Sequence, residues 1–385
     1  MVRPAVNFRC DVCVVGGGPA GAIAAYVLAG AGAGVALIVR DRPNLALAVG
    51  ETVPAETRPL LNRLGLDCLS ADLHLPSAGT MARWGSDAVH CREAILSPYG
   101  CGWHLDRRLF ERQLIAAAVK KGAALLEGCA RIETKSALTG WEFQIESAGR
   151  QIYATASYLV DCTGRTARLA VEAGARRRIH DKLIAIWCVA EELHPRGDPD
   201  RRIYLESAPD GWLYSAQIPN RRRVMVYFTD GDLCDISRMR SAANFEDYIA
   251  NFFHLNAVTD GLQYRIVAGP FCANAVSTNL VQAHGDRWIA AGDAAQSFDP
   301  LSSQGIVSAI VGGNNAAAAL IAAHSWDDCA LEKLQADLDG KYAAYLAERH
   351  VHYRAEQRWK ERPFWQRRHN ASAVEGQGSG AGLFD

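Results

Sequence analysis

The sequence predicts an α/β fold in which a Rossmann-like domain is interleaved with an antiparallel β-sheet domain and followed by C-terminal helices. Three observations predict it. A strand–helix–strand pattern occupies residues 11–39, and β-branched, alternating stretches fill residues 183–228. Far from the first unit, a short apolar strand at 288–291 precedes an alanine-rich helix at 306–324. The pieces of one α/β domain therefore come from separate parts of the chain.

The elements follow from apolar periodicity and turn signals. Residues 11–15 predict a buried strand, 21–31 a small-residue helix that can pack closely on a sheet, and 35–39 the next parallel strand. The later elements are a helix at 109–121, paired strands at 141–145 and 151–159, an antiparallel sheet over 183–228, a strand at 288–291, and helices at 306–324 and 331–357.

These elements divide the chain into four regions. Residues 1–75, 100–180 and 275–325 form the discontinuous Rossmann-like domain, while 76–99 and 181–274 form a β-rich domain for the substrate. Residues 326–369 form a C-terminal helical region, and 370–385, rich in Gly, Ser and Ala, form a flexible tail. A simple dehydrogenase would keep its nucleotide fold contiguous, so the interleaving argues against one.

The bulk composition argues against several classes of protein. The net charge is -1, which gives no reason to expect nucleic acid as a partner. No stretch approaches the roughly 18 apolar residues that a transmembrane helix needs. The first apolar run leads into a folded unit, so we expect no signal peptide. The 11 cysteines are scattered and odd in number, which favours a reducing compartment and a cytoplasmic protein.

A C-x-x-C pair, Cys10 and Cys13, raises the alternative of a zinc or redox site. A tetrahedral zinc site would need a second close pair, which the sequence lacks, and Cys13 falls inside the first predicted strand. We therefore expect no metal.

A glycine motif of the form G-x-G-x-x-G follows the first strand and opens the first helix; it reads Gly16-Gly17-Gly18-Pro19-Ala20-Gly21. The first glycine allows the tight turn, the second lets the backbone approach a pyrophosphate, and the third lets helix and strand pack closely. The helix N-terminus offers free N–H groups and a partial positive charge to phosphates. This pattern predicts a dinucleotide site, with the adenine-side phosphates at the loop.

One partner of that motif is missing. The second strand should end in a carboxylate that holds the adenosine ribose hydroxyls, but the expected position holds Val39. Asp41, two residues later, could reach round, or the ribose is held in another way.

A second motif identifies the dinucleotide. Gly292 and Asp293 follow the strand at 288–291, and the chain continues as AAQSFDPLSSQGI through residue 306. A carboxylate at a strand end can accept hydrogen bonds from the ribityl hydroxyls of a flavin. The turn at Pro300 and the glycine at 305 would place backbone N–H groups and a helix dipole against the pyrimidine end of the ring. Together the two motifs predict FAD.

The two motifs resemble those of the FAD-dependent monooxygenases of the aromatic-hydroxylase fold and of the flavin-dependent halogenases. Further segments extend the resemblance over most of the chain. They are residues 49–54 (VGETVP), 102–107 (GWHLDR), 161–165 (DCTGR), 211–219 (GWLYSAQIP) and 356–365. This combination is similar to the LodB- and GoxB-like flavoproteins, which are associated with the maturation of a tryptophan-derived quinone cofactor inside a partner oxidase.

The resemblance implies roles for particular residues. Arg107 would contact the FAD phosphate or ribose, Asp293 would hold the ribityl-phosphate region, and Glu51 lies in a loop that passes the cofactor, or is a surface carboxylate. Asp161 and Gly164 would end a structural strand near the cofactor. The residues that would line the isoalloxazine are Pro300, Gln304, Gly305 and Ile306.

Halogenation and oxygenation are the two reactions to separate. A flavin halogenase uses a lysine in a segment that corresponds here to residues 79–84, yet Lys120 is the first lysine of the chain. The halogenase W-x-W-x-I-P signature is also altered, because two extra residues separate Tyr214 from Ile218. Both departures favour oxygenation, in which reduced flavin and dioxygen form a hydroperoxide that attacks an aromatic ring.

Oxygenation asks few side chains to act. His104 and Tyr214 are candidates for proton handling, although packing or hydrogen-bonding roles are the alternative for each, and Trp212 would be a wall of the substrate pocket. The chain has only one glycine fingerprint, so NAD(P)H would bind transiently or reduction would come from elsewhere.

The C-terminal segment 341–369 mixes arginines with aromatic residues. It is either a docking surface for a protein substrate or, as we favour, a helical segment that packs its aromatics on the core with its arginines solvated.

The leading hypothesis is an FAD-dependent monooxygenase that uses O₂ and hydroxylates an aromatic small molecule or a tryptophan in a partner protein. The alternatives are a halogenase, another small-molecule tailoring oxidoreductase, and a non-catalytic FAD-binding redox partner.

Overall fold

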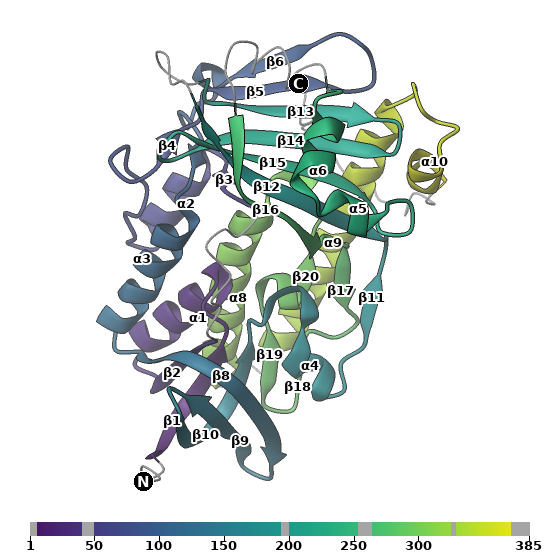
Figure 1. The fold of residues 1–385 in the computed structure, drawn as a ribbon. Helices are drawn as coiled ribbons and strands as arrows, with labels where there is room; N and C mark the ends of the chain where they lie inside the picture. The colour runs from purple at the N-terminus through teal and green to yellow at the C-terminus, as the bar shows by residue number, and fades with distance from the viewer. Residues whose placement is uncertain (1–5, 41–49, 194–199, 253–263, 325–328, 371–385) are drawn as a thin grey trace.

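The structure, a computed structural model, describes residues 6–40, 50–193, 200–252, 264–324 and 329–370. It confirms the predicted fold class: a Rossmann-like sheet with helices on it, a second and mainly antiparallel sheet, and helices at the C-terminal end. Figure 1 shows the second sheet at the top and the Rossmann-like sheet at the base, with α1, α3 and α8 between them.

The Rossmann-like layer is built on parallel pairings. β1 pairs in parallel with both β2 and β10, β2 pairs with the start of β8, and β10 pairs with β19. The hairpin strand β9 pairs antiparallel with the second half of β8 and with the first half of β10. The strands are β1 (Val6–Val15), β2 (Val35–Arg40), β8 (Ala124–Ala137), β9 (Gly140–Ser147), β10 (Arg150–Asp161), β18 (His284–Gly285) and β19 (Trp288–Ala290). β1 begins earlier than the apolar run predicted, because Val6 already pairs with Ile152 of β10.

The second sheet has the order β16-β12-β15-β14-β13-β5-β6. Its pairings are antiparallel except between β13 and β5. The strands are β5 (Gly79–Arg83), β6 (His90–Glu93), β12 (Leu183–Glu192), β13 (Arg202–Ala208), β14 (Gly211–Ile218), β15 (Arg222–Asp230) and β16 (Tyr264–Asn274). They all fall within 76–99 and 181–274, the limits that we propose for the substrate domain.

Two small sheets lie between the large ones. One contains β3 (Thr52–Val53), β7 (Trp103–His104) and β4 (Leu75–Pro76), and the other contains β11 (Arg177–Ile179), β17 (Thr278–Leu280) and β20 (Gln296–Ser297). The first of these sheets sets segments 52–53 and 103–104 side by side, although they are far apart in the chain.

The helices pack on both layers. They are α1 (Pro19–Gly30), α2 (Thr57–Arg63), α3 (Arg107–Lys120), α4 (Arg168–Glu172), α5 (Ile236–Met239), α6 (Ala242–Ile249), α8 (Gly305–His324), α9 (Ala330–Ala355) and α10 (Pro363–His369). Short 3-10 turns lie at 94–96, 164–166, 292–294 and 300–302. α9 belongs to both cores, because Leu334 packs with the Rossmann-like layer and Tyr353 with the second sheet.

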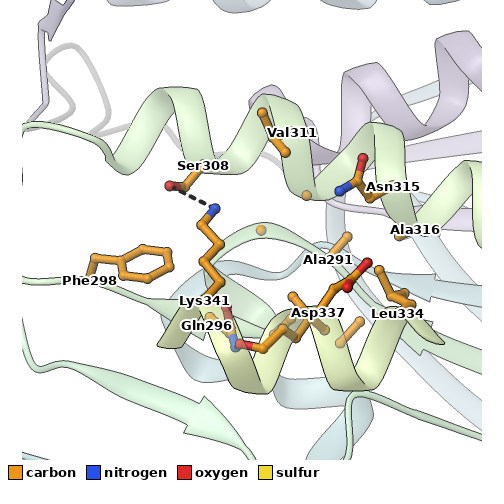
Figure 2. Close-up of a pocket in the computed structure, with 15 residues that line it drawn as sticks. Ala291, Gln296, Phe298, Ser308, Val311, Asn315, Ala316, Leu334, Asp337 and Lys341 are labelled. Atoms are coloured by element: carbon orange, nitrogen blue, oxygen red, sulfur yellow. Dashed lines mark hydrogen bonds between the residues drawn. The ribbon is translucent and has the colours of Figure 1, made fainter. Parts of the chain in front are cut away.

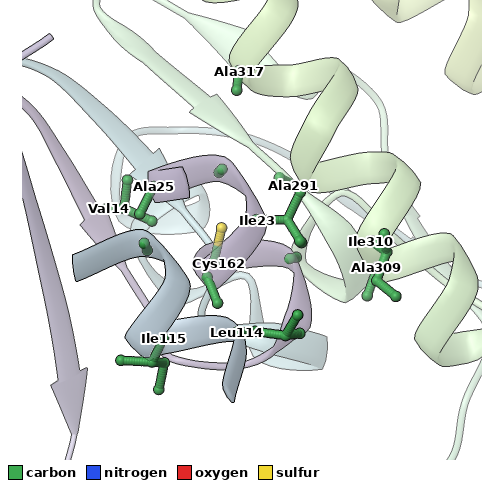
Figure 3. Close-up of a cluster of buried hydrophobic side chains, with 14 of the residues drawn as sticks. Val14, Ile23, Ala25, Leu114, Ile115, Cys162, Ala291, Ala309, Ile310 and Ala317 are labelled. Carbon is green, nitrogen blue, oxygen red and sulfur yellow. The ribbon is translucent and has the colours of Figure 1, made fainter. Parts of the chain in front are cut away.

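Small side chains allow α1, α3 and α8 to lie close together (Figure 3). Ile23 and Ala25 of α1 meet Ala309 and Ile310 of α8 in one buried cluster, to which Leu114 of α3 also belongs. α8 is the one described helix that is long and apolar enough to cross a membrane, with a mean hydropathy of 1.6 in its most apolar window. In this fold it packs against α1 and α9, as a core helix does.

Candidate active site

The glycine loop leaves a helix N-terminus open. Gly16 has a φ of +124°, and a Cβ there would lie 2.1 Å from the Cys162 carbonyl oxygen. A Cβ at Gly21 would lie 1.8 Å from the Gly16 oxygen, so both positions require glycine for backbone packing. By contrast, a Cβ at Gly18 would meet nothing within 4 Å, and no side chain caps α1. Open space therefore lies beside Gly18 at the uncapped N-terminus of α1, where an anionic group can bind.

The second motif packs directly on this helix end. Gly292 has a φ of +60°, and a Cβ there would lie 2.5 Å from the Ala20 Cβ. Gly313 of α8 lies as close, since its Cβ would be 2.2 Å from the Ala20 oxygen. Asp293 keeps 32% of its side chain exposed, and its Oδ2 lies 3.5 Å from Nε of Arg165. The fold thus brings Gly16, Gly18, Gly21 and Asp293 into one region, and Arg165 is a partner that the sequence did not identify.

The segment from Pro300 to Ile306 joins the two layers. Leu301 packs into the core of the second sheet, whereas Ile306 packs into the Rossmann-like core. Between them, Gln304 and Gly305 are exposed at the start of α8, and Pro300 is half-buried. The predicted isoalloxazine-lining residues therefore lie at the boundary between the layers.

Glu51 is not the surface carboxylate that was the alternative to a site residue. Its side chain is buried, and its Oε2 has no hydrogen-bond partner among the residues that the structure describes. Burial raises the pKa of Glu51 to about 7, although the nearby Arg107 guanidinium opposes the shift. Arg107 donates from Nη1 to the Gly50 oxygen over 2.8 Å and pairs with Glu111. A buried, unpartnered carboxyl oxygen marks a position that a polar ligand group would satisfy.

His104 and Tyr214 are connected by a residue that the sequence did not single out. The Thr52 hydroxyl lies 3.0 Å from Nδ1 of His104 and 2.6 Å from the Tyr214 hydroxyl. His104 is fully buried, and its Nε2 lies 2.7 Å from the Arg201 carbonyl oxygen. Burial lowers the pKa of His104 to about 4, so its ring is neutral at physiological pH. The only available signal for Thr52 was its place beside Glu51 in the VGETVP segment.

Trp212 does not lie where a pocket wall was expected. Its side chain has no exposed surface, stacks on Phe228 at 4.1 Å between ring centroids, and meets Trp84 edge to face. Its Nε1 donates to the Tyr353 hydroxyl, which in turn donates to Asp299. Trp212 is therefore part of the aromatic core beneath the second sheet. Tyr214, two residues along β14, is the only residue of that strand with partly exposed surface.

On the adenosine side of the site, Val39 stands at the end of β2 where a carboxylate was expected. The Val39 methyl groups lie against Gly17, where a Cβ would come within 2.7 Å of them. An apolar contact thus occupies the end of β2, and Asp41 lies outside the described residues. Cys10 and Cys13 both lie within β1, and nowhere in the described ranges do three His, Cys, Asp or Glu side chains converge to hold a metal ion.

Two cavities lie near these elements, and neither contains a glycine-loop residue. A cavity of about 60 Å³ separates α8 from α9 beside Gly292; there the Lys341 amine points at Ser308, 3.3 Å away, with Phe298 alongside (Figure 2). Burial lowers the pKa of Lys341. A cavity of about 520 Å³ lies between the start of β12, the end of β15, α9 and α10.

The C-terminal segment packs on the core, as we favoured, but its arginines differ from the prediction. Phe364 and Trp365 are completely buried. Arg368 is also buried and pairs with Asp230 at 2.8 Å, and Arg349, with 12% of its side chain exposed, pairs with Asp181 at 2.6 Å. The prediction of solvated arginines is wrong for these two, because each guanidinium faces a carboxylate, one just before β12 and the other at the end of β15.

Comparisons with known proteins agree with this geometry. The FAD-binding domain family matches residues 9–331. The FAD-dependent oxidoreductase LodB of Marinomonas mediterranea is 29% identical over 377 residues, which cover 95% of this chain and 98% of LodB. A digeranylgeranylglycerophospholipid reductase of Methanoculleus marisnigri is 26% identical over 84% of this chain and 79% of its own length.

Solved structures share the fold. The myxobacterial chondrochloren halogenase CndH superposes with a TM-score of 0.81 at 19% identity, covering 95% of this chain and 86% of CndH. The peptidyl tryptophan dihydroxylase QhpG, essential for tryptophylquinone cofactor biogenesis, has a TM-score of 0.71 at 22% identity, covering 97% of this chain and 81% of QhpG.

The match to the family extends from β1 to the start of α9 and includes the open helix end, the Gly292–Asp293 turn and the buried Glu51. The chain belongs to the FAD-binding domain family and is an FAD-dependent oxidoreductase.

Proposed function

We propose that this protein is an FAD-dependent monooxygenase that hydroxylates an aromatic ring, with a tryptophan side chain of a partner protein as the preferred substrate. Reduced NAD(P)H would supply the electrons and O₂ the oxygen atom. The observation that carries the proposal is the cluster of Glu51, Thr52, His104 and Tyr214 between the FAD-binding elements and the second sheet. It combines polar groups with burial of Glu51 and His104 from solvent, and ring hydroxylation requires that water be excluded.

Bound FAD would supply the oxygen-transfer chemistry itself. The chain contributes binding and orientation. The α1 N-terminus would hold the phosphates, Asp293 the ribityl region, and Arg107 the phosphate or ribose. Pro300, Gln304, Gly305 and Ile306 would border the flavin ring, and the dipole of α8 would favour negative charge there. Glu51 would give its unpartnered oxygen to the cofactor or to ordered water beside it.

Halogenation is the alternative that the local structure disfavours. The segment of β5 and the following Trp84 contains no lysine. Trp84 lies in the aromatic core and donates from Nε1 to the His352 oxygen, while Arg83 pairs with Glu206. The segment therefore offers no amine that could take up a hypohalous acid.

One relative favours a protein-bound substrate over a free one. QhpG acts on a peptidyl tryptophan and matches 97% of this chain. LodB matches nearly its whole length at a higher identity. QhpG superposes over almost all of this chain with a TM-score of 0.71, which supports a similar reaction here.

The test is a reaction of the purified flavoprotein with NADPH and ¹⁸O₂ in the presence of tryptophan-containing peptides, free indoles or phenols, each with and without chloride and bromide. We expect one labelled oxygen atom in an aromatic product and substrate-stimulated NADPH oxidation. The G18A variant, which should fold without holding FAD, is the matched negative control. A halogenated product with no oxygen gain would replace the proposal with the halogenase alternative. Bound FAD without turnover under any reductant would favour the non-catalytic redox partner.

A further inference from the structure

The cavity between β12, β15, α9 and α10 combines the volume of a ligand site with a basic wall. Its volume is about 520 Å³, within the range of roughly 300 to 1,000 Å³ that small-molecule sites occupy. No residue of the glycine loop or of the Gly292–Asp293 turn lines it. It is therefore separate from the site that we assign to FAD.

Basic side chains outnumber acidic ones around this cavity. Four basic and two acidic side chains line it: Lys182, Arg349, Arg367 and Arg368, with Asp181 and Asp230. Asp232 adds a third carboxylate, because it pairs with both Lys182 and Arg367 at 2.7 Å. The Asp299 carboxyl accepts from the Tyr353 hydroxyl and is not part of the wall, and burial raises its pKa. Four cationic groups thus face three carboxylates among the described residues, and one anionic group from a ligand would balance them.

Arg349 has hydrogen-bond donors to offer such an anion. Its side chain is 12% exposed, and its Nη1 donates to Asp181 over 2.6 Å and to the Ser277 hydroxyl over 2.8 Å. Among the described residues these are the hydrogen bonds of Arg349, which leaves the N–H groups of Nε and Nη2 for a ligand. A planar guanidinium can hold a carboxylate by two parallel hydrogen bonds of this kind.

Arg368 shows the contrasting arrangement. Both of its terminal nitrogens donate to Asp230, and Nη1 also donates to the Phe364 oxygen. Its side chain is 7% exposed, and its ion pair fastens α10 to the end of β15. Arg368 therefore has a structural role, whereas Arg349 keeps one side of its guanidinium for the cavity.

The rest of the wall suits an apolar body. Leu346 and the rings of His180, His350 and Tyr353 line the cavity. The volume exceeds what an inorganic anion fills, so these groups would cover the carbon skeleton of a ligand while its charge meets Arg349.

We propose that this cavity binds a small organic monocarboxylate, with its carboxylate on Nε and Nη2 of Arg349 and its apolar body against Leu346 and Tyr353. Lys182 and Arg367 keep 63% and 39% of their side chains exposed, so they stand at the entrance and attract the anion. The binding site does not depend on the proposed hydroxylation.

Hydrogen bonds connect this site to the proposed flavin border. Nη1 of Arg349 donates to the Ser277 hydroxyl, which lies 2.7 Å from the Tyr345 hydroxyl. The Tyr345 hydroxyl accepts from the backbone N–H of Asp299, the residue before Pro300. A carboxylate that draws Arg349 toward the cavity would therefore alter the hydrogen bonds at Asp299, and flavin absorbance should report its binding. This coupling rests on the proposed contact of Pro300 with the flavin ring.

Calorimetric titration of the oxidised holoenzyme tests the ligand class. The probes are hexanoate with hexanamide and cyclohexanecarboxylate with cyclohexanecarboxamide, at constant ionic strength, so that each pair differs in its charge. We expect the acid of each pair to bind about tenfold more tightly than the amide, as a charge-assisted hydrogen bond predicts. Equal affinities within both pairs, or no binding of either acid, overturns the proposal. Inorganic phosphate is the third probe, and its binding without either acid overturns the carboxylate class.

Two variants locate the probes in the cavity. R349K keeps the charge beside Asp181 but loses the planar fork, so the affinity for both acids should fall by about tenfold or more. L346W fills the cavity, leaves every charge in place and should abolish acid binding. R354K makes the first change at an exposed residue of α9 and should bind the acids as the wild type does. Unchanged acid binding in R349K and L346W overturns the site, and L346W alone decides if R349K does not fold.

S277A tests the coupling to the flavin. It removes the hydroxyl between Arg349 and Tyr345 but no group that we assign to the ligand. Hexanoate should shift the flavin absorbance of the wild type, whereas S277A should bind hexanoate with unchanged affinity and lose most of the shift. S207A, at a buried serine that accepts from Arg358, is the matched control and should keep both.

The outcomes separate the coupling, the site and the proposed function. No absorbance change in the wild type, or one that S277A retains, refutes the coupling. Loss of acid binding with normal oxygen transfer is the result expected of L346W. Oxygen transfer that fails with every substrate while the acids still bind would sink the proposed function and leave this site standing.

Discussion

Gly292 lies against Ala20, although the two residues are far apart in the chain. A Cβ at Gly292 would come within 2.5 Å of the Ala20 Cβ. The contact fixes the Asp293 turn on the N-terminus of α1. Through it, the parts of the site that we propose to bind the phosphates and the ribityl chain keep a constant spacing.

G292A should therefore weaken FAD binding. The added methyl group meets Ala20, and the φ of +60° is unfavourable for alanine, so the turn and the helix end must separate. We expect the affinity of the protein for FAD to fall by about tenfold or more, because the turn and the helix end no longer keep their spacing. Titration of apoprotein with FAD measures it. G340A, at a helical glycine with nothing within 4 Å, is the control and should bind FAD normally.

The G18A substitution should reduce FAD binding without destabilising the fold. A Cβ at Gly18 meets no atom of the protein within 4 Å, so the apoprotein should melt within a few degrees of wild type. The methyl group would stand in the space that the pyrophosphate needs, so flavin content after purification should fall sharply. G21A gives the contrast, because its Cβ would lie 1.8 Å from the Gly16 oxygen and should destabilise the fold itself. Normal flavin content in G18A would contradict the assignment of the loop.

E51Q should change how the stability of the apoprotein depends on pH. The folded-state pKa of Glu51 is raised to about 7 from 4.5, so the unfolded chain releases the proton first as pH rises. Its contribution to the free energy of unfolding is therefore fully favourable below about pH 4.5 and is lost between there and pH 7, by at most about 3 kcal/mol. E51Q, which carries no charge, should be more stable than wild type at pH 8 and equal to it near pH 4.5. Denaturant unfolding at the two pH values measures this, and a constant difference would contradict the burial of an ionising Glu51.

F364A tests whether α10 is a structural element or a docking surface. Phe364 has no exposed surface and packs with Tyr353 and Trp365, while the Arg368 guanidinium lies 3.5 Å from its ring centroid. Removing a buried phenylalanine costs about 3 to 5 kcal/mol, so the melting temperature should fall by several degrees. R354A, at an exposed site on α9, should leave it unchanged. An unaltered melting temperature in F364A would favour the docking alternative.

Local sequence determined the parts of this protein that depend on neighbours in the chain. The strand, glycine turn and helix at 11–31 follow from a buried apolar run and from backbone approaches that only glycine permits. The Gly292–Asp293 turn and the long helix after Gly305 follow in the same way, and their separation along the chain already implied an interleaved fold. Together they were enough to predict FAD.

Tertiary structure alone decided what depends on distant side chains. Trp212 and Tyr214 have the same periodicity on β14, but α9 and α10 cover the first and leave the second partly open. Arg349 and Arg368 looked like solvated charges until the ends of β12 and β15 placed Asp181 and Asp230 beside them. Thr52 acquires its two hydrogen bonds only because β3 pairs with β7 beneath β14. Burial and hydrogen-bond partners are set by which segments meet in space, and residue type and spacing cannot specify that.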